Sequence, residues 1–210
     1  MFFFVKKIFS FILDKNYNFT KTLLNQYFTG KKKTVLSFSS IGGGIKHIQN
    51  EEFFNLTKKY NVLFIRDITR SWFNNVDINL IKKNITKKNC YAIGHSMGAF
   101  NAIIFSTLYK IRKVIAFSPQ FSIHPHITKD TTFRNHAARI KEWRYPKLKF
   151  NKNTNYLLIF GDDVKEKYHA SLIPKRKNIK VIFIKNCDHN TAKKLKIQNK
   201  LYKLINNFFK

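Results

Sequence analysis

The sequence is poor in cysteine, glycine, proline and acidic residues. Its 210 residues include two cysteines, seven glycines, four prolines and eleven acidic residues. Two cysteines cannot form a disulfide framework, and because Cys90 and Cys187 each adjoin an apolar run, buried thiols are favoured over a disulfide or a metal site. No apolar run reaches the length that a membrane-spanning helix needs. The sequence therefore predicts neither a disulfide-stapled protein nor an integral membrane protein.

The scarcity of acidic residues leaves a large positive charge. Forty lysines and arginines give a formal net charge of +29. Such a charge is typical of proteins that bind nucleic acid, anionic lipid or an acidic polymer. However, the cations are mostly lysines spread along the chain, the codon-biased residues Asn, Ile and Phe are also abundant, and no nucleic-acid-binding motif is present. A biased surface is favoured, with an anionic substrate as the alternative and no specific nucleic-acid partner.

The N-terminal stretch is apolar but does not resemble a signal peptide. Lys6 and Lys7 interrupt it, no basic region precedes it, and no small-residue cleavage site follows it. Apolar residues within positions 1–13 could share one helical face, which either packs on the protein or rests on a membrane surface; packing is favoured. We expect a poorly defined segment over 1–33 and a cytoplasmic protein.

Short apolar runs alternate with longer amphipathic stretches from Thr34 onward. Strands are expected over 34–39, 61–66, 90–93, 112–117, 155–160 and 179–184. Helices are expected over 48–60, 76–88, 97–110, 165–173 and 191–209. This alternation predicts one α/β domain over 1–210, with a mainly parallel sheet and helices on both faces. Residues 118–154 break the rhythm and are expected to form a small basic lid-like insertion, with a helix near 131–143.

Six of the seven glycines lie where apolar runs end, and two of them flank a serine. Gly94-His95-Ser96-Met97-Gly98 follows one apolar run and begins a helical stretch. A serine between two glycines in a strand–turn–helix setting is the nucleophile elbow, in which the tight turn exposes the hydroxyl. A turn that merely contains a serine is the alternative. Ser96 is therefore the predicted nucleophile.

A serine hydroxyl needs a base, and in folds with this elbow the partners follow in the order serine, acid, histidine. His189 comes directly after the last predicted strand, which is where the base belongs. The acid is expected after the preceding strand, where Gly161 is followed by Asp162 and Asp163. Asp163 is slightly favoured, Asp162 is the alternative, and Glu166 is an outside candidate. A carboxylate there that is not catalytic would cap the following helix.

The chemistry also requires donors for the oxyanion that forms in acyl transfer. One is expected to be the backbone N–H of Met97, and the other that of Ile41, in the glycine-rich loop after the first long strand. A phosphate-binding loop is the rival interpretation of that loop, but the Lys-Ser/Thr pair of a nucleotide P-loop is missing. We expect no metal and no nucleotide cofactor.

At these residues the chain resembles the α/β-hydrolase superfamily, from about Thr34 to the C-terminus. Short words around Asp67 and Trp72, at 116–120 and at 168–170 resemble small bacterial hydrolase-like proteins, some of them associated with surface polysaccharides. The resemblance implies a compact α/β-hydrolase fold. The sequence departs from it in a shorter acid turn and in having no evident strands before Thr34, so a truncated sheet is expected.

Together these features predict a serine esterase or thioesterase that works through an acyl-serine. Its substrate would be a small molecule or a glycan ester, and Arg134, Arg139 and Arg144 would bind an anionic group on it. An O-acyltransferase that acts on a glycan hydroxyl is the main alternative, and a non-catalytic basic binding protein on the same scaffold is the third. The sequence carries no signal for acyl length or oligomeric state.

Overall fold

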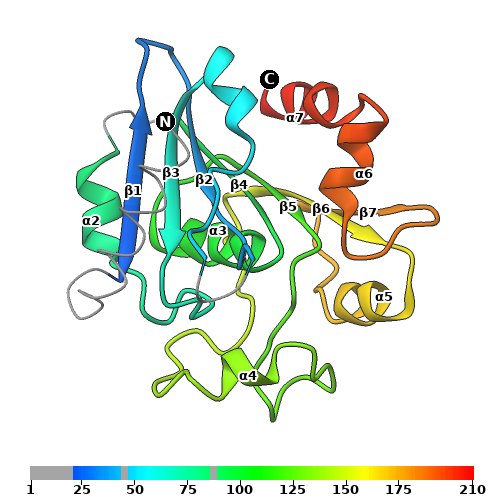
Figure 1. Cartoon of the computed structure of the whole chain (residues 1–210). Helices are drawn as coiled ribbons and strands as arrows, with labels where there is room; N and C mark the ends of the chain where they lie inside the picture. Colours follow the sequence, from blue (N-terminus) through cyan, green and yellow to red (C-terminus); the bar gives the residue numbers. More distant parts are fainter. Residues whose placement is uncertain (1–20, 44–46, 86–88) are drawn as a thin grey trace.

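A single seven-stranded sheet organises the chain (Figure 1). The structure, a computed structural model, describes residues 21–43, 47–85 and 89–210. The strand order is β1-β3-β2-β4-β5-β6-β7, and all neighbours are parallel except β1 and β3. The strands are β1 (Thr22–Tyr27), β2 (Thr34–Phe38), β3 (Asn61–Asp67), β4 (Cys90–His95), β5 (Lys113–Phe117), β6 (Asn155–Gly161) and β7 (Ile179–Ile184). The predicted α/β fold with a mainly parallel sheet is confirmed.

Helices cover both faces of the sheet because successive side chains of each buried strand point to opposite sides. In β4, Cys90 and Ala92 belong to one apolar cluster, and Tyr91 and Ile93 belong to the other. The first cluster includes residues of α2 (Ile78–Lys83) and α3 (Met97–Leu108), and Ala170 of α5 (Val164–Ser171) packs against it. The second includes residues of η1 (Phe54–Lys58), α6 (Thr191–Ile197) and α7 (Leu201–Phe209). The two strand faces therefore build two separate cores.

The expectation that the sheet begins at Thr34 is wrong. Thr22–Tyr27 adds an antiparallel edge strand, paired from Thr22↔Asp67 to Tyr27↔Val62. Most of this strand is half-buried or exposed, because it has a neighbour on one side only. Such a strand needs little apolar patterning, so its sequence did not predict it.

Several helices are shorter than predicted. Within 48–60 only the 3₁₀ turn η1 forms, and it follows Phe53 in the left-handed region at φ 61°. The predicted helix over 191–209 is broken at Asn199, also left-handed at φ 56°, into α6 and α7. Asparagine tolerates that conformation better than most residues. In the 131–143 stretch only α4 (Arg134–Ala137) is helical.

Residues 118–154 connect β5 to β6. They lie beyond the carboxyl ends of the parallel strands, and their helix α4 is below the sheet in Figure 1. One side of this segment is held by α5: Nε2 of His169 lies 3.0 Å from the Asp130 carboxylate, and the Lys129 N–H donates to the Tyr168 hydroxyl at 2.9 Å. On the other side, the Tyr145 N–H donates to Oδ1 of Asn74 at 2.8 Å. The segment is thus fixed over the strand ends by both flanks.

Two further expectations concern thiols and membranes. Cys90 and Cys187 are both buried and do not form a disulfide. Within the described part of the chain, no helix has the length and apolarity to cross a bilayer. The expected apolar helical face of residues 1–13 lies outside the described residues.

Candidate active site

Ser96 occupies a turn that only the two flanking glycines allow. A Cβ added to Gly94 would lie 2.2 Å from the backbone of Gly98, and one added to Gly98 would lie 2.1 Å from the carbonyl oxygen of Phe38. Ser96 itself has φ 54° and ψ −123°, a strained conformation for a residue with a side chain. It lies between β4 and α3, as the elbow pattern predicts, and is only 3% exposed.

His189 is paired with the carboxylate of Glu166. Nδ1 of His189 lies 2.8 Å from Oε1 of Glu166, and Oε2 of Glu166 accepts the Gly161 N–H at 3.1 Å. Glu166 projects from α5 and is 4% exposed. Because the carboxylate can only accept, Nδ1 carries the proton, which leaves the lone pair of the neutral imidazole on Nε2.

The expectation that Asp163 or Asp162 would pair with His189 is therefore corrected in favour of Glu166. Asp163 is the N-cap of α5, and its carboxylate accepts the Glu166 N–H at 3.0 Å. This is the helix-capping role anticipated for a carboxylate that does not pair with the histidine. Because α5 begins directly after the strand, the side chain that reaches His189 comes from its first turn.

Asp162 instead binds the loop that carries His189. Its two carboxylate oxygens accept the N–H groups of Asn186 at 2.9 Å and Cys187 at 3.0 Å, and these hydrogen bonds lower the pKa of Asp162. The same loop lies against Gly161, where an added Cβ would be 2.3 Å from the carbonyl oxygens of Cys187 and Asp188. The end of β6 and the histidine loop are thus packed backbone to backbone.

His95, which lies within the elbow, contacts the backbone of His189. Nε2 of His95 lies 2.8 Å from the carbonyl oxygen of His189, to which it can only donate. Burial, together with the nearby His189, lowers the pKa of His95 to about 4. His95 is therefore neutral near pH 7 and holds the backbone of His189 by one hydrogen bond.

Gln120 was not among the predicted site residues. Its amide nitrogen lies 3.2 Å from Oγ of Ser96 and 3.4 Å from Nε2 of His189. Its amide oxygen accepts a hydrogen bond from the indole nitrogen of Trp72 at 3.1 Å. Gln120 follows β5 by three residues and ends the 116–120 word that resembles small bacterial hydrolase-like proteins, but that resemblance assigned it no role. Only the fold brings it between Ser96 and His189.

The residues expected to supply oxyanion donors come from the elbow itself and from the loop after β2. Met97 is the first residue of α3, where a backbone N–H has no acceptor within the helix. Ile41 lies in the loop after β2, and its carbonyl oxygen accepts from Nε of Arg70 at 3.4 Å. Glu52 accepts the N–H and the hydroxyl of Ser40 in the same loop. Burial raises the pKa of Glu52 to about 7.

The chain matches the family model described as "serine aminopeptidase, S33" over residues 67–197, which is more than half of its length. The chain belongs to this α/β-hydrolase family. A comparison with curated protein sequences gave no match.

Solved structures of α/β hydrolases share the fold. A capsule O-acetyltransferase of Neisseria meningitidis serogroup A is 17% identical, with a TM-score of 0.62 over 90% of this chain and 92% of that chain. An α/β-superfamily hydrolase from Oenococcus oeni is 10% identical, with a TM-score of 0.65 over 90% of this chain and 96% of that one. A carboxylesterase from Bacillus subtilis is 13% identical, with a TM-score of 0.53 over 89% and 87%. The expected superfamily and fold are confirmed.

The three predicted arginines of this α/β hydrolase lie in different places. Arg134 begins α4, next to Phe133, whose ring centroid is 6.4 Å from that of His189. Arg139 lies close enough to His136 to contribute, with burial, to lowering the pKa of that histidine. Arg134 and Arg139 are exposed.

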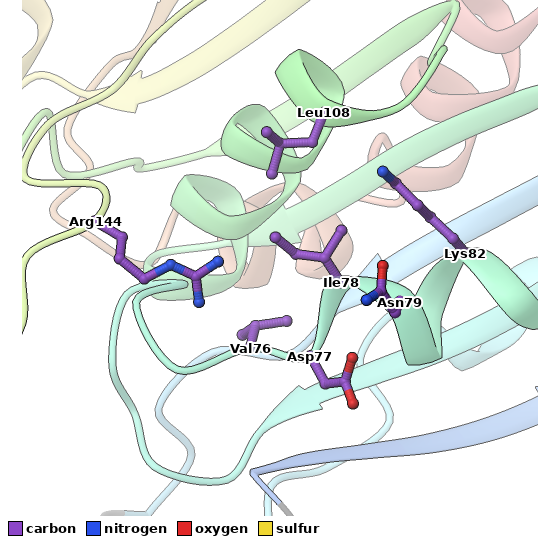
Figure 2. A pocket seen from close by; sticks show the side chains of 7 residues that line it. All are labelled: Val76, Asp77, Ile78, Asn79, Lys82, Leu108 and Arg144. Carbon is purple, nitrogen blue, oxygen red and sulfur yellow. The ribbon is translucent and has the colours of Figure 1, made fainter.

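Arg144 lies in a separate open hollow of about 390 Å³. Figure 2 shows its guanidinium pointing toward Val76 and Ile78, with the amine of Lys82 on the opposite side of the hollow. The lining of this hollow contains neither Ser96 nor His189. The structure therefore does not bring the three arginines together around the hydrolase elbow. Among the described residues, no group of three His, Cys, Asp or Glu side chains could hold a metal ion.

Proposed function

We propose that this α/β hydrolase transfers acyl groups through Ser96, with His189 as general base and Glu166 as the carboxylate that orients it. The observation that carries the proposal is the pair formed by half-buried His189 and buried Glu166, joined through the Gln120 amide to the serine of a nucleophile elbow. A nucleophile, a base and a group that orients the base are the components of serine acyl transfer.

The reaction proceeds in two steps. Oγ of Ser96 attacks the carbonyl carbon of an ester or thioester while Nε2 of His189 takes the hydroxyl proton. The N–H groups of Met97 and Ile41 stabilise the tetrahedral oxyanion, and its collapse expels an alcohol or thiol that receives the proton from His189. Water, deprotonated by His189, then attacks the acyl-serine; collapse of this second intermediate releases the acid, and His189 returns the proton to Oγ of Ser96.

Ser96 and His189 share the Gln120 amide nitrogen, at 3.2 and 3.4 Å, in the absence of substrate. Hydrogen bonds between catalytic groups are often long or poorly aligned without substrate and tighten in the complex. We therefore expect Oγ of Ser96 to contact Nε2 of His189 directly once substrate is bound.

A glycan O-acyltransferase is the second candidate. Ser96 is only 3% exposed, and Gln120 of residues 118–154 contacts it, which favours a bound hydroxyl acceptor over bulk water. One protein with this fold is a capsule O-acetyltransferase, and the structure of a mutant of it was solved in complex with CoA. Acetyl transfer from acetyl-CoA to an added polysaccharide, faster than hydrolysis of acetyl-CoA alone, would favour this candidate over an esterase.

We also propose that residues 118–154 act as a lid and that Arg134 and Arg139 bind an anionic group of the substrate. Both are exposed on or near α4, whose neighbour Phe133 approaches His189. Arg134→Ala or Arg139→Ala should raise the KM for an anionic ester and leave the KM for a neutral ester unchanged. Arg144 serves as the matched control because it lines a different hollow. The proposed setting is cytoplasmic, and the proposed partners include no nucleic acid.

Labelling by a fluorophosphonate probe tests the nucleophile. The wild-type protein should be labelled, and Ser96→Ala should not. His189→Ala should slow labelling by about 10⁴-fold or more. In hydrolysis of a short-chain p-nitrophenyl ester, the double variant should be little slower than either single variant, because members of a triad act as a unit. Ser171→Ala, a change at an exposed serine, is the control. A wild-type protein that is not labelled would instead favour a non-catalytic binding protein on this scaffold.

A further inference from the structure

The orientation of the Gln120 amide is determined by its neighbour Trp72. The side chain of Gln120 is buried, with 2% of the residue exposed. An indole N–H can only donate, so the atom 3.1 Å from it must be the amide oxygen of Gln120. The amide nitrogen must then face Ser96 and His189.

The amide nitrogen has two protons and three acceptors within reach. These are Oγ of Ser96 at 3.2 Å, the carbonyl oxygen of Ser118 at 3.4 Å and Nε2 of His189 at 3.4 Å. Nε2 is an acceptor because Nδ1 carries its proton toward Glu166. One side-chain donor therefore points at both atoms between which the proton moves.

We propose that Gln120 is a catalytic residue that stabilises the negative charge developing on Oγ of Ser96. This inference rests on the proposed function. As His189 takes the proton, the O–H bond breaks, an N–H bond forms on Nε2, and charge accumulates on Oγ until the bond to the acyl carbon is complete. The Gln120 N–H donates to Oγ throughout and exchanges no proton. A donor preorganised in a buried site needs no rearrangement as the charge appears.

Trp72 is the positioning residue in this arrangement. Its indole N–H prevents the Gln120 amide from turning over, which would place an oxygen against Oγ of Ser96. Trp72 also packs against Phe133 at 5.1 Å between ring centroids, and Phe133 belongs to the 118–154 segment. The donor beside the nucleophile is thus connected to the proposed lid.

The experiment compares fluorophosphonate labelling rates in three variants. Gln120→Met keeps the approximate size and removes the donor, and Gln120→Glu keeps the shape and the Trp72 contact but places a carboxylate oxygen near Oγ. Trp72→Phe removes the orienting hydrogen bond, together with part of the buried indole's volume. We expect Gln120→Met to lower the second-order rate by about 10²–10³-fold, the loss typical of one such donor. Gln120→Glu should lose at least as much, and Trp72→Phe should lose less.

The control is Gln198→Met, at an exposed glutamine, whose rate should equal that of the wild type. Thermal unfolding of each variant separates loss of chemistry from loss of fold; if Gln120→Met unfolds, the isosteric Gln120→Glu decides. A Gln120 variant that folds and reacts at or above the wild-type rate, while Ser96→Ala stays unlabelled, overturns the role of Gln120 alone. An unlabelled wild type overturns the proposed function and this inference with it.

Discussion

The two halves of the candidate site are held in place by different means. The elbow that carries Ser96 is determined by steric exclusion, since neither Gly94 nor Gly98 has room for a Cβ. The half that carries His189 and Glu166 is held mainly by hydrogen bonds, which Asp162 and Asp163 accept and His95 donates, with one further steric restriction at Gly161. A sterically determined turn leaves a pattern in the sequence. A turn held by hydrogen bonds can use several residue types and leaves little pattern.

The largest expected effect concerns the hydrogen-bonded half. Glu166→Gln should lower the acylation rate by about 10³–10⁴-fold, because an amide beside Nδ1 favours the wrong imidazole tautomer. Asp163→Asn should cost far less, since an asparagine N-cap still accepts the Glu166 N–H. Single-turnover release of p-nitrophenol from a short-chain ester measures both rates. A larger loss in Asp163→Asn than in Glu166→Gln would return the role to the aspartate.

The next effect concerns the sterically determined half. Gly98→Ala would place a methyl group 2.1 Å from the carbonyl oxygen of Phe38, so the sheet or α3 must shift. We expect the free energy of unfolding to fall by about 3 kcal/mol or more, at or above the upper end of overpacking costs. Gly43→Ala is the matched control, because its Cβ would approach only the flexible side chain of His47, at 3.3 Å. Equal stability of the two variants in urea would contradict steric control of the elbow.

The smallest effect concerns the loop of Ile41, in which Glu52 accepts two hydrogen bonds from Ser40. The pKa of Glu52 is raised in the folded state to about 7, so the folded protein retains a proton that the unfolded chain releases near pH 4.5. Glu52 therefore contributes most below pH 4.5, and stability falls as pH rises from there through about 7, by at most about 3 kcal/mol.

Glu52→Gln cannot ionise at this position, so its stability should not show the part of the decrease with rising pH that Glu52 causes. Urea unfolding at pH 5 and pH 8 measures it: the variant should gain stability relative to the wild type on going from pH 5 to pH 8. Asp67 is another buried carboxylate with a raised pKa, and because both proteins contain it, its contribution cancels when the variant and the wild type are compared at each pH. A difference between variant and wild type that does not change with pH would show that Glu52 ionises normally.

The sequence alone was sufficient for the parallel core, the elbow with Ser96 and the placement of His189 after the last strand. These features follow from apolar periodicity and from steric limits on glycine, both of which are local. The edge strand β1 was missed because an edge strand needs little apolar patterning, and the long helix over 191–209 was overpredicted because Asn199 breaks it.

Only the tertiary structure decided which carboxylate faces His189 and that Gln120 lies between His189 and Ser96. The sequence ranked Asp163 before Asp162 and Glu166 by position alone, and what separates them is where α5 begins and which side of its first turn faces the histidine loop. Gln120 meets Ser96 from a different strand, across 24 positions in the chain. Such contacts depend on the distances between folded elements, which no local pattern of residues specifies.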